Sequence, residues 1–186
     1  MQRTKHGGSE AVPRTPNEES RAIVSPDAST RKSPIPLTEN RVHPYPHLYT
    51  ASGTAGPAGS VAVTSPGLPE IATAPPPEFD GPGGTWSPEA LLCASLADCF
   101  ILTFRALAKG SKFEWIGLDC RVDGVLEKAE GVTRFTKYTT YATLKVTPGS
   151  DVAKGRALLE RAEHYCLVSN SVNGTRSLAA EVVPAA

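Results

Sequence analysis

The segment of residues 88–109 constrains the fold most, because it reads as one long apolar helix with defined ends. Ser87 supplies a capping hydroxyl, Pro88 suits the first turn, and Glu89 complements the positive end of the helix dipole. Gly110 is a natural stop. Apolar residues recur around the helix, namely Leu91, Leu92, Leu96, Phe100, Ile101, Phe104 and Leu107. The sequence therefore predicts a central core helix that is buried nearly all round.

Shorter elements flank this helix on both sides. The predicted strands are residues 48–52, 60–64, 115–126, 132–146 and 178–183, and the predicted helices are residues 151–165 and a short one within 167–173. The first two strands form a hairpin around a glycine-containing loop. Strands, a buried helix, strands, a helix and a final strand make an α+β domain.

Residues 1–46 differ in composition from the rest of the chain. They are rich in Ser, Pro and Arg and have no sustained apolar period. Such a segment buries too little apolar surface to offset the entropy of ordering it. We predict a disordered or loosely ordered N-terminal tail over residues 1–46 and a folded domain over residues 47–186. The tail is too acidic for an organelle transit peptide and lacks the apolar core of a secretory signal, so we expect a cytoplasmic protein.

The charge balance limits the classes of partner. The chain has 19 basic and 19 acidic side chains and a formal net charge of zero. We therefore expect neither nucleic acid nor an anionic membrane as the main partner. No apolar run approaches the roughly 18 to 20 residues that a membrane span requires. The ligand expected is small or neutral.

Four cysteines, Cys93, Cys99, Cys120 and Cys166, are the candidate reactive groups. They have no CxxC spacing and no zinc-finger pairing with histidine, so we expect no metal and no cofactor. Cys93 and Cys99 are six residues apart, which places them about 120° apart on a helix and excludes them as a pair. Cys120 has no neighbouring cue and is interpreted as a small buried filler.

Two motifs surround Cys99 and Cys166. The first is the run PGGTWSPEALL over residues 82–92, which leads into ADCF at residues 97–100, and the second is HYCLVSN at residues 164–170. From residue 47 to the C-terminus the chain resembles the OsmC/Ohr superfamily, which contains osmotically inducible protein C and the organic hydroperoxide resistance proteins. Two cysteine motifs in the right order make this resemblance fairly specific.

The resemblance implies both a fold and an activity. The implied fold is OsmC-like, with an antiparallel sheet and a central buried helix, in an intertwined homodimer whose active sites are shared between chains. The implied activity is the thiol-dependent reduction of organic hydroperoxides. Cys99 falls on the nucleophilic cysteine of the family, Cys166 on the resolving cysteine, and Glu89 on the glutamate at the helix start. An external dithiol, of the lipoyl type or another, would restore both thiols.

The chain departs from the family at two places. Family hydroperoxide reductases resemble one another in an arginine on the first hairpin loop that helps to hold the thiolate, but residues 53–60 contain none. Arg134, Arg105 or a tail arginine such as Arg41 would then have to substitute. Leu167 stands where a proline commonly follows the second cysteine.

Glu89 poses a geometric problem of its own. Ten residues of helix separate it from Cys99 by roughly 15 Å, so it reaches the thiol only across a dimer interface or through a cation that it orients. The structural alternative is a carboxylate that complements the helix dipole.

Two further functions stay open at this point. One is a redox-sensing or binding protein in which the same cysteines pair without efficient turnover, and the missing arginine favours it. The other is a structural dimeric domain with inert thiols.

Overall fold

The structure, a computed structural model, describes residues 43–185. The predicted tail therefore lies outside the described residues except for 43–46. Residues from Leu48 onward form one unit, which contains two three-stranded sheets and two long helices. This arrangement confirms the predicted α+β class.

The first sheet is a small antiparallel meander. It consists of β1 (Ser52–Thr54), β2 (Val61–Thr64) and β3 (Ile71–Thr73), in that order. The hairpin of β1 and β2 agrees with the sequence, although β1 begins at Ser52 rather than at residue 48. The strand β3 was not predicted, because its three residues are too short to show a period of two.

The second sheet contains the longest strands of the chain. β4 (Gly117–Ala129) and β5 (Val132–Val146) pair in antiparallel fashion across a turn at Glu130 and Gly131, both of which have positive φ angles of 54° and 82°. Such a two-residue turn matches the twist of the strands that it joins. β6 (Thr175–Pro184) pairs with β5 in parallel.

The parallel pairing of β6 differs in detail from the antiparallel sheet that the resemblance implies. Its cause is the helix α2 (Val152–Tyr165), which carries the chain back to the end of the sheet where β5 started. The side chain of Asp151 caps this helix, since its Oδ1 accepts the Lys154 N–H at 2.9 Å.

The helix α1 (Pro88–Gly110) forms as predicted, but its burial is only one-sided. Ser87 Oγ accepts the Ala90 N–H at 3.2 Å, which satisfies one of the free donors at the helix start. The buried residues are Leu96, Phe100, Phe104 and Ala108, whereas Leu102 is 49% exposed. The prediction of burial all round is therefore wrong for residues 43–185, which leave much of the opposite face of α1 exposed.

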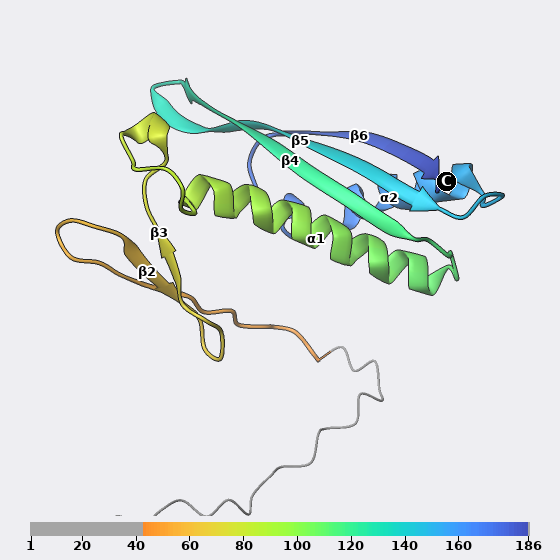
Figure 1. Cartoon of the computed structure of the whole chain (residues 1–186), viewed down its shortest axis with the longest axis horizontal. Coiled ribbons are helices and arrows are strands. Elements are labelled where there is room, and N and C mark those ends of the chain that lie inside the picture. The colour runs from red at the N-terminus through yellow and green to blue at the C-terminus, as the bar shows by residue number, and fades with distance from the viewer. Residues whose placement is uncertain (1–42, 186) are drawn as a thin grey trace, which may run out of the picture. The chain divides into compact units, whose positions relative to one another are not determined.

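By length and mean hydropathy alone, α1 would also suffice to cross a membrane, contrary to the prediction that no apolar run is long enough. A core helix passes the same test. Here α1 and α2 lie on one face of the second sheet (Figure 1), with their apolar residues in one cluster with those of β5. Phe104 packs edge-on against Trp115, with ring centroids 5.3 Å apart. This cluster is the core, and it holds the middle of α1 close to the end of α2.

Gly155 marks the tightest packing of α2 on the sheet. A Cβ atom at this position would lie 3.1 Å from the Phe113 ring and 3.3 Å from Leu144. We predict that Gly155→Val lowers the free energy of unfolding by about 1–3 kcal/mol, through overpacking. Ala153→Val, at an exposed position of the same helix, should cost less than about 1 kcal/mol. Urea denaturation of both variants checks this, and equal losses would contradict it.

Candidate active site

Cys99 lies in the middle of α1 and is partly exposed. Its Sγ accepts the backbone N–H of Val168 at 3.5 Å. The hydroxyl of Thr103, one turn further along α1, lies 4.0 Å from the same sulfur. Cys99 thus faces the segment that follows α2, and this segment supplies a donor to it.

Cys166 immediately follows α2 and is fully buried. Its Sγ accepts the Ser169 N–H at 3.5 Å, and its carbonyl oxygen accepts the Asn170 N–H at 3.0 Å. These bonds wind residues 166–171 into a tight turn that ends in the 3-10 helix η2 (Ser169–Ser171), within the predicted segment 167–173. Leu167, where the resemblance implies a proline, is 72% exposed.

The Cys99 thiol on α1 and the Cys166 thiol in this turn face each other. Burial raises the pKa of Cys166, and its hydrogen bond with the Cys99 thiol raises the pKa further, while the Ser169 donors lower it in part. The raised pKa means that Cys166 keeps its proton at neutral pH. The structure therefore brings together Cys99 and Cys166, which are 67 residues apart in the sequence.

Cys120 is a third thiol near this pair. It lies on the inner face of β4 and packs against the core, in agreement with its interpretation as a filler. Burial raises the pKa of Cys120 to about 11, and the nearby Glu163 and Cys166 contribute in the same direction. Cys120 is therefore a poor nucleophile at neutral pH.

Cys93 lies in different surroundings, as its angular separation from Cys99 predicts. A Cβ atom at Gly124 would lie 3.0 Å from Cys93 Sγ, so this thiol packs directly on the backbone of β4. Burial raises the pKa of Cys93. Together with Glu89 and Phe135, Cys93 lines a hollow of about 380 Å³. It takes no part in the Cys99 and Cys166 pair.

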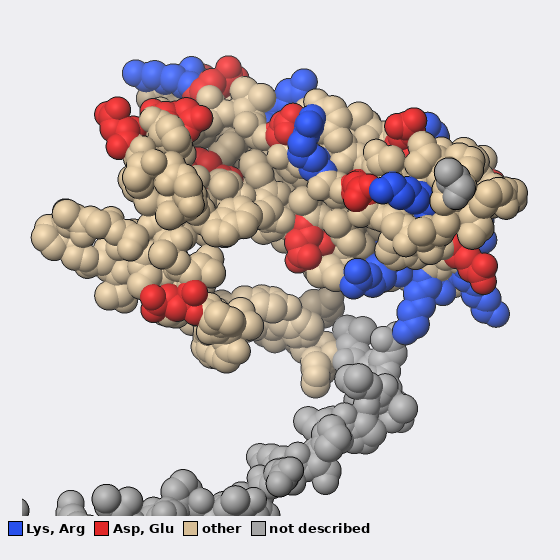
Figure 2. All heavy atoms as spheres, in the orientation of Figure 1, with Lys and Arg blue, Asp and Glu red and all other residues tan. Residues whose placement is uncertain are grey.

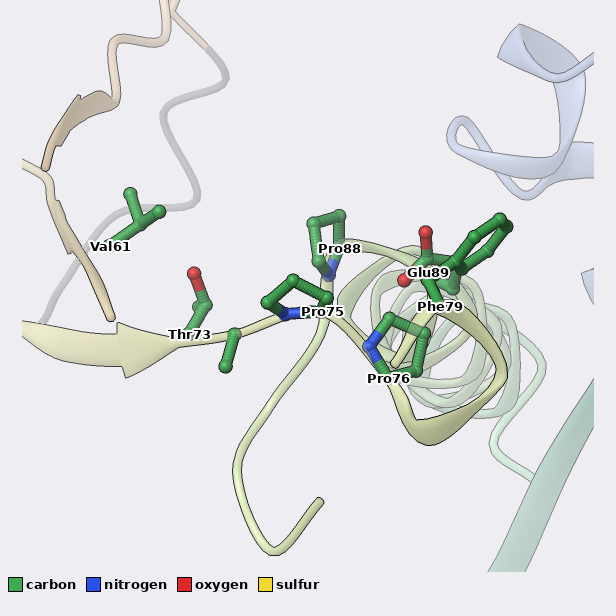
Figure 3. A pocket seen from close by; sticks show the side chains of 8 residues that line it. Val61, Thr73, Pro75, Pro76, Phe79, Pro88 and Glu89 are labelled. Atoms are coloured by element: carbon green, nitrogen blue, oxygen red, sulfur yellow. The ribbon is translucent and has the colours of Figure 1, made fainter. Parts of the chain in front are cut away.

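Glu89 lies at the start of α1, ten residues from Cys99, and the single chain does not bring the two together. It lines both the hollow beside Cys93 and a second one of about 320 Å³, formed with β2, β3 and Phe79 (Figure 3). The Oε2 atom of Glu89 is buried and has no hydrogen-bond partner within residues 43–185. A buried carboxylate oxygen without a donor is costly, which indicates that its hydrogen-bond partner comes from outside the described residues.

Neither of the two described arginines considered as substitutes is hydrogen-bonded to Cys99. Arg134 binds Glu130 at 2.9 Å at the exposed turn between β4 and β5, Arg105 is exposed on α1, and Arg41 lies outside the described residues. Lys and Arg side chains gather where α1 ends, whereas an acidic side chain lies over the middle of α1 (Figure 2). In the part of the chain that the structure describes, the hydrogen-bond partners of Cys99 are neutral groups.

Sequence reasoning missed two groups at this site. Thr103 follows Cys99 by four residues, so helical spacing alone places it on the same face of α1. Val168 acts through its backbone N–H, for which residue type gives no signal. No group of three or more metal-ligating side chains occurs within the described residues.

The fold and the thiol pair together define an α+β protein of the OsmC type, and the comparisons agree. Residues 81–179 match the family of OsmC-like proteins. The chain therefore belongs to the OsmC-like family, within the OsmC/Ohr superfamily.

Sequence relatives lie in the same superfamily. An organic hydroperoxide resistance protein of Xanthomonas axonopodis pv. citri is 30% identical over 131 residues, which cover 68% of this chain and 89% of that protein. The uncharacterized protein YmaD of Bacillus subtilis is 28% identical over 138 residues, which cover 73% of this chain and 92% of that protein.

Solved structures show the same fold. An organic hydroperoxide resistance protein OsmC from Legionella pneumophila superposes with a TM-score of 0.61 at 25% identity, covering 73% of this chain and 97% of that one. An OsmC-like protein of unknown function from Vibrio cholerae superposes with a TM-score of 0.65 at 17% identity, covering 72% and 99%.

The thiols should differ in their rates of alkylation. With a pKa of about 11, only about one Cys120 in a thousand is ionised at pH 8, and the raised pKa of Cys166 likewise suppresses its thiolate. We predict that substoichiometric iodoacetamide at pH 8 labels Cys99 well before Cys120 or Cys166. Peptide mass spectrometry measures the order. Labelling of Cys120 should rise about tenfold per pH unit up to pH 11, and its early labelling at pH 8 would contradict the assignment.

Proposed function

We propose that this protein is a thiol-dependent peroxidase that reduces organic hydroperoxides to alcohols. The observation that carries the proposal is the contact between a partly exposed thiol, Cys99, and a buried thiol, Cys166, in a chain of the OsmC-like family. The name of the Xanthomonas relative supports the same activity.

In the first step, the Cys99 thiolate attacks the terminal oxygen of the hydroperoxide. The O–O bond breaks, the sulfur becomes a sulfenic acid, and the alkoxide leaves and takes a proton from water. Partial exposure of Cys99 admits the substrate. The Val168 N–H already points at Cys99 Sγ, at 3.5 Å.

In the second step, the Cys166 sulfur attacks the sulfenic acid of Cys99. A disulfide forms, and hydroxide leaves and is protonated to water. Because Cys166 already contacts Cys99, this step needs little rearrangement and competes with further oxidation. An external dithiol, of the lipoyl type or another, then reduces the disulfide by exchange.

The surroundings of Cys99 favour an organic peroxide over hydrogen peroxide. On the same helix Leu102 is 49% exposed, and the half-buried Val168 lies across from Cys99. An apolar wall binds a carbon chain and offers little to a small polar molecule. The charge balance of the chain likewise suits a neutral substrate in the cytoplasm.

We also propose a homodimer in which α1 lies at the interface. The exposed side of α1 carries apolar residues such as Leu102, and Glu89 at its start lacks a hydrogen-bond partner within the described residues. A second chain packed on α1 would cover these apolar residues and supply a hydrogen-bond partner to Glu89. Glu89 would then serve the site of the other chain, as the resemblance implies.

A redox sensor that cycles slowly is the second candidate, and one observation favours it. Residues 53–60, where the family places the arginine beside the thiolate, contain no basic residue. Turnover of cumene hydroperoxide with a dithiol separates the two functions. A rate no higher than that of free thiol would leave the sensor as the better description.

Two cysteine variants test the roles of the thiols. We predict that Cys99→Ser abolishes peroxide consumption, because the attacking sulfur is lost. Cys166→Ser should consume one equivalent and then advance to sulfinic acid, because nothing captures the sulfenic acid. Cys93→Ser, outside the pair, is the matched control and should turn over like the unmodified protein. Peroxide loss and intact mass measure both effects, and full activity of Cys99→Ser would overturn the assignment.

The oligomeric state tests the interface. We predict that the protein sediments at twice the chain mass and that Leu102→Glu shifts it toward the monomer, because a charge enters an apolar interface. Val132→Glu, at an apolar position that is 59% exposed on β5, is the control and should leave the mass unchanged. A monomer in the unmodified protein would refute the dimer.

A further inference from the structure

We propose that two neutral donors, the backbone N–H of Val168 and the hydroxyl of Thr103, hold the Cys99 thiolate in place of a positively charged side chain. The inference deepens the proposed peroxidase function and rests on Cys99 being the attacking thiol. Both groups are positioning groups, since they act on the peroxide through the sulfur.

The hydrogen bonds of the turn show that the Val168 N–H has Cys99 Sγ as its partner. Among consecutive backbone donors, Ser169 N–H goes to Cys166 Sγ, Asn170 N–H to the Cys166 carbonyl, and Ser171 N–H to the Val168 carbonyl. The Val168 N–H goes to Cys99 Sγ at 3.5 Å. Two adjacent amides thus serve the two sulfurs of the pair. The turn therefore orients both thiols and supplies each with a donor.

Thr103 approaches the same sulfur from within α1. It follows Cys99 by four residues, so both side chains lie on one face, with Oγ1 at 4.0 Å from Sγ. A hydroxyl rotates to accept from a thiol and to donate to a thiolate. Ionisation of Cys99 therefore turns this contact into a stabilising hydrogen bond, without movement of the backbone.

These donors explain how the thiol pair operates without the arginine that residues 53–60 lack. Donors aimed at the charged form of a group favour that form, whether or not they carry a charge themselves. Neutral donors differ from a cation in one measurable respect, because salt screens the attraction between charges far more than a short hydrogen bond. Reactivity of Cys99 should therefore depend only weakly on ionic strength.

The backbone donor can be removed by proline, because Val168 has φ −69°, close to the angle that proline imposes. We expect Val168→Pro to slow alkylation of Cys99 at pH 7 about tenfold and to move the pH midpoint of alkylation upward. Val168→Ala loses side-chain atoms but keeps the N–H, so its rate and midpoint should stay within about twofold of the unmodified protein. Equal behaviour of the two variants would overturn the role of this amide.

The hydroxyl is tested by an independent pair that does not alter the backbone. Thr103→Val keeps the shape and removes the donor, whereas Thr103→Ser keeps the donor and loses a methyl group. We expect the valine variant alone to slow alkylation, by about threefold or more, and to move the pH midpoint upward. This pair decides the hydroxyl's role even where the proline variant fails to fold.

Alkylation needs no peroxide, so these measurements stand apart from the test of peroxidase turnover. If the variants slow alkylation as expected but the protein does not turn over peroxide, the role of the neutral donors stands and the proposed function fails. Conversely, a rate that falls steeply between about 0.05 and 1 M NaCl would show a positively charged group at the thiolate and overturn the inference. Unchanged rates in both Val168→Pro and Thr103→Val, with both variants folded, would overturn it as well.

Discussion

The hydrogen bond from Val168 to Cys99 is the contact on which the arrangement of the site depends, because it joins the turn after α2 to the middle of α1. Neither partner is free to move on its own. Phe100 and Phe104 anchor α1 in the core, and Leu159 and Ala162 anchor α2 on the sheet. Core packing therefore holds the two segments in place, and the hydrogen bond aligns the turn with the Cys99 sulfur.

Burial sorts the four cysteines by reactivity. It raises the pKa values of Cys93, Cys120 and Cys166, each of which packs on backbone or core atoms. Cys99 combines partial exposure with donors aimed at its sulfur. This asymmetry suits the proposed roles, since the partly exposed thiol has hydrogen-bond partners and the buried thiol beside it has a raised pKa.

Local signals in the sequence were sufficient for the helices and the long strands, because caps, turns and apolar periods act over a few residues. Ser87 caps α1 as expected, α2 lies within the predicted residues 151–165, and β5 covers the predicted residues 132–146. The parallel pairing of β6 and the one-sided burial of α1 depend on contacts between distant segments, which periodicity does not encode. For the site, the resemblance joined Cys99 to Cys166, whereas the Val168 amide had no signature in residue type.

The buried carboxylate of Glu89 and the exposed apolar side of α1 have a common explanation. The carboxylate is buried without a donor among the described residues, and the same helix leaves apolar side chains such as Leu102 in water. Within residues 43–185 both conditions are unfavourable: the buried carboxylate has an electrostatic cost, and the exposed apolar side chains have a hydrophobic one. A small ligand at Glu89 would relieve only the first. A second chain along α1 would relieve both, and it would do so beside Cys99, at the middle of the same helix.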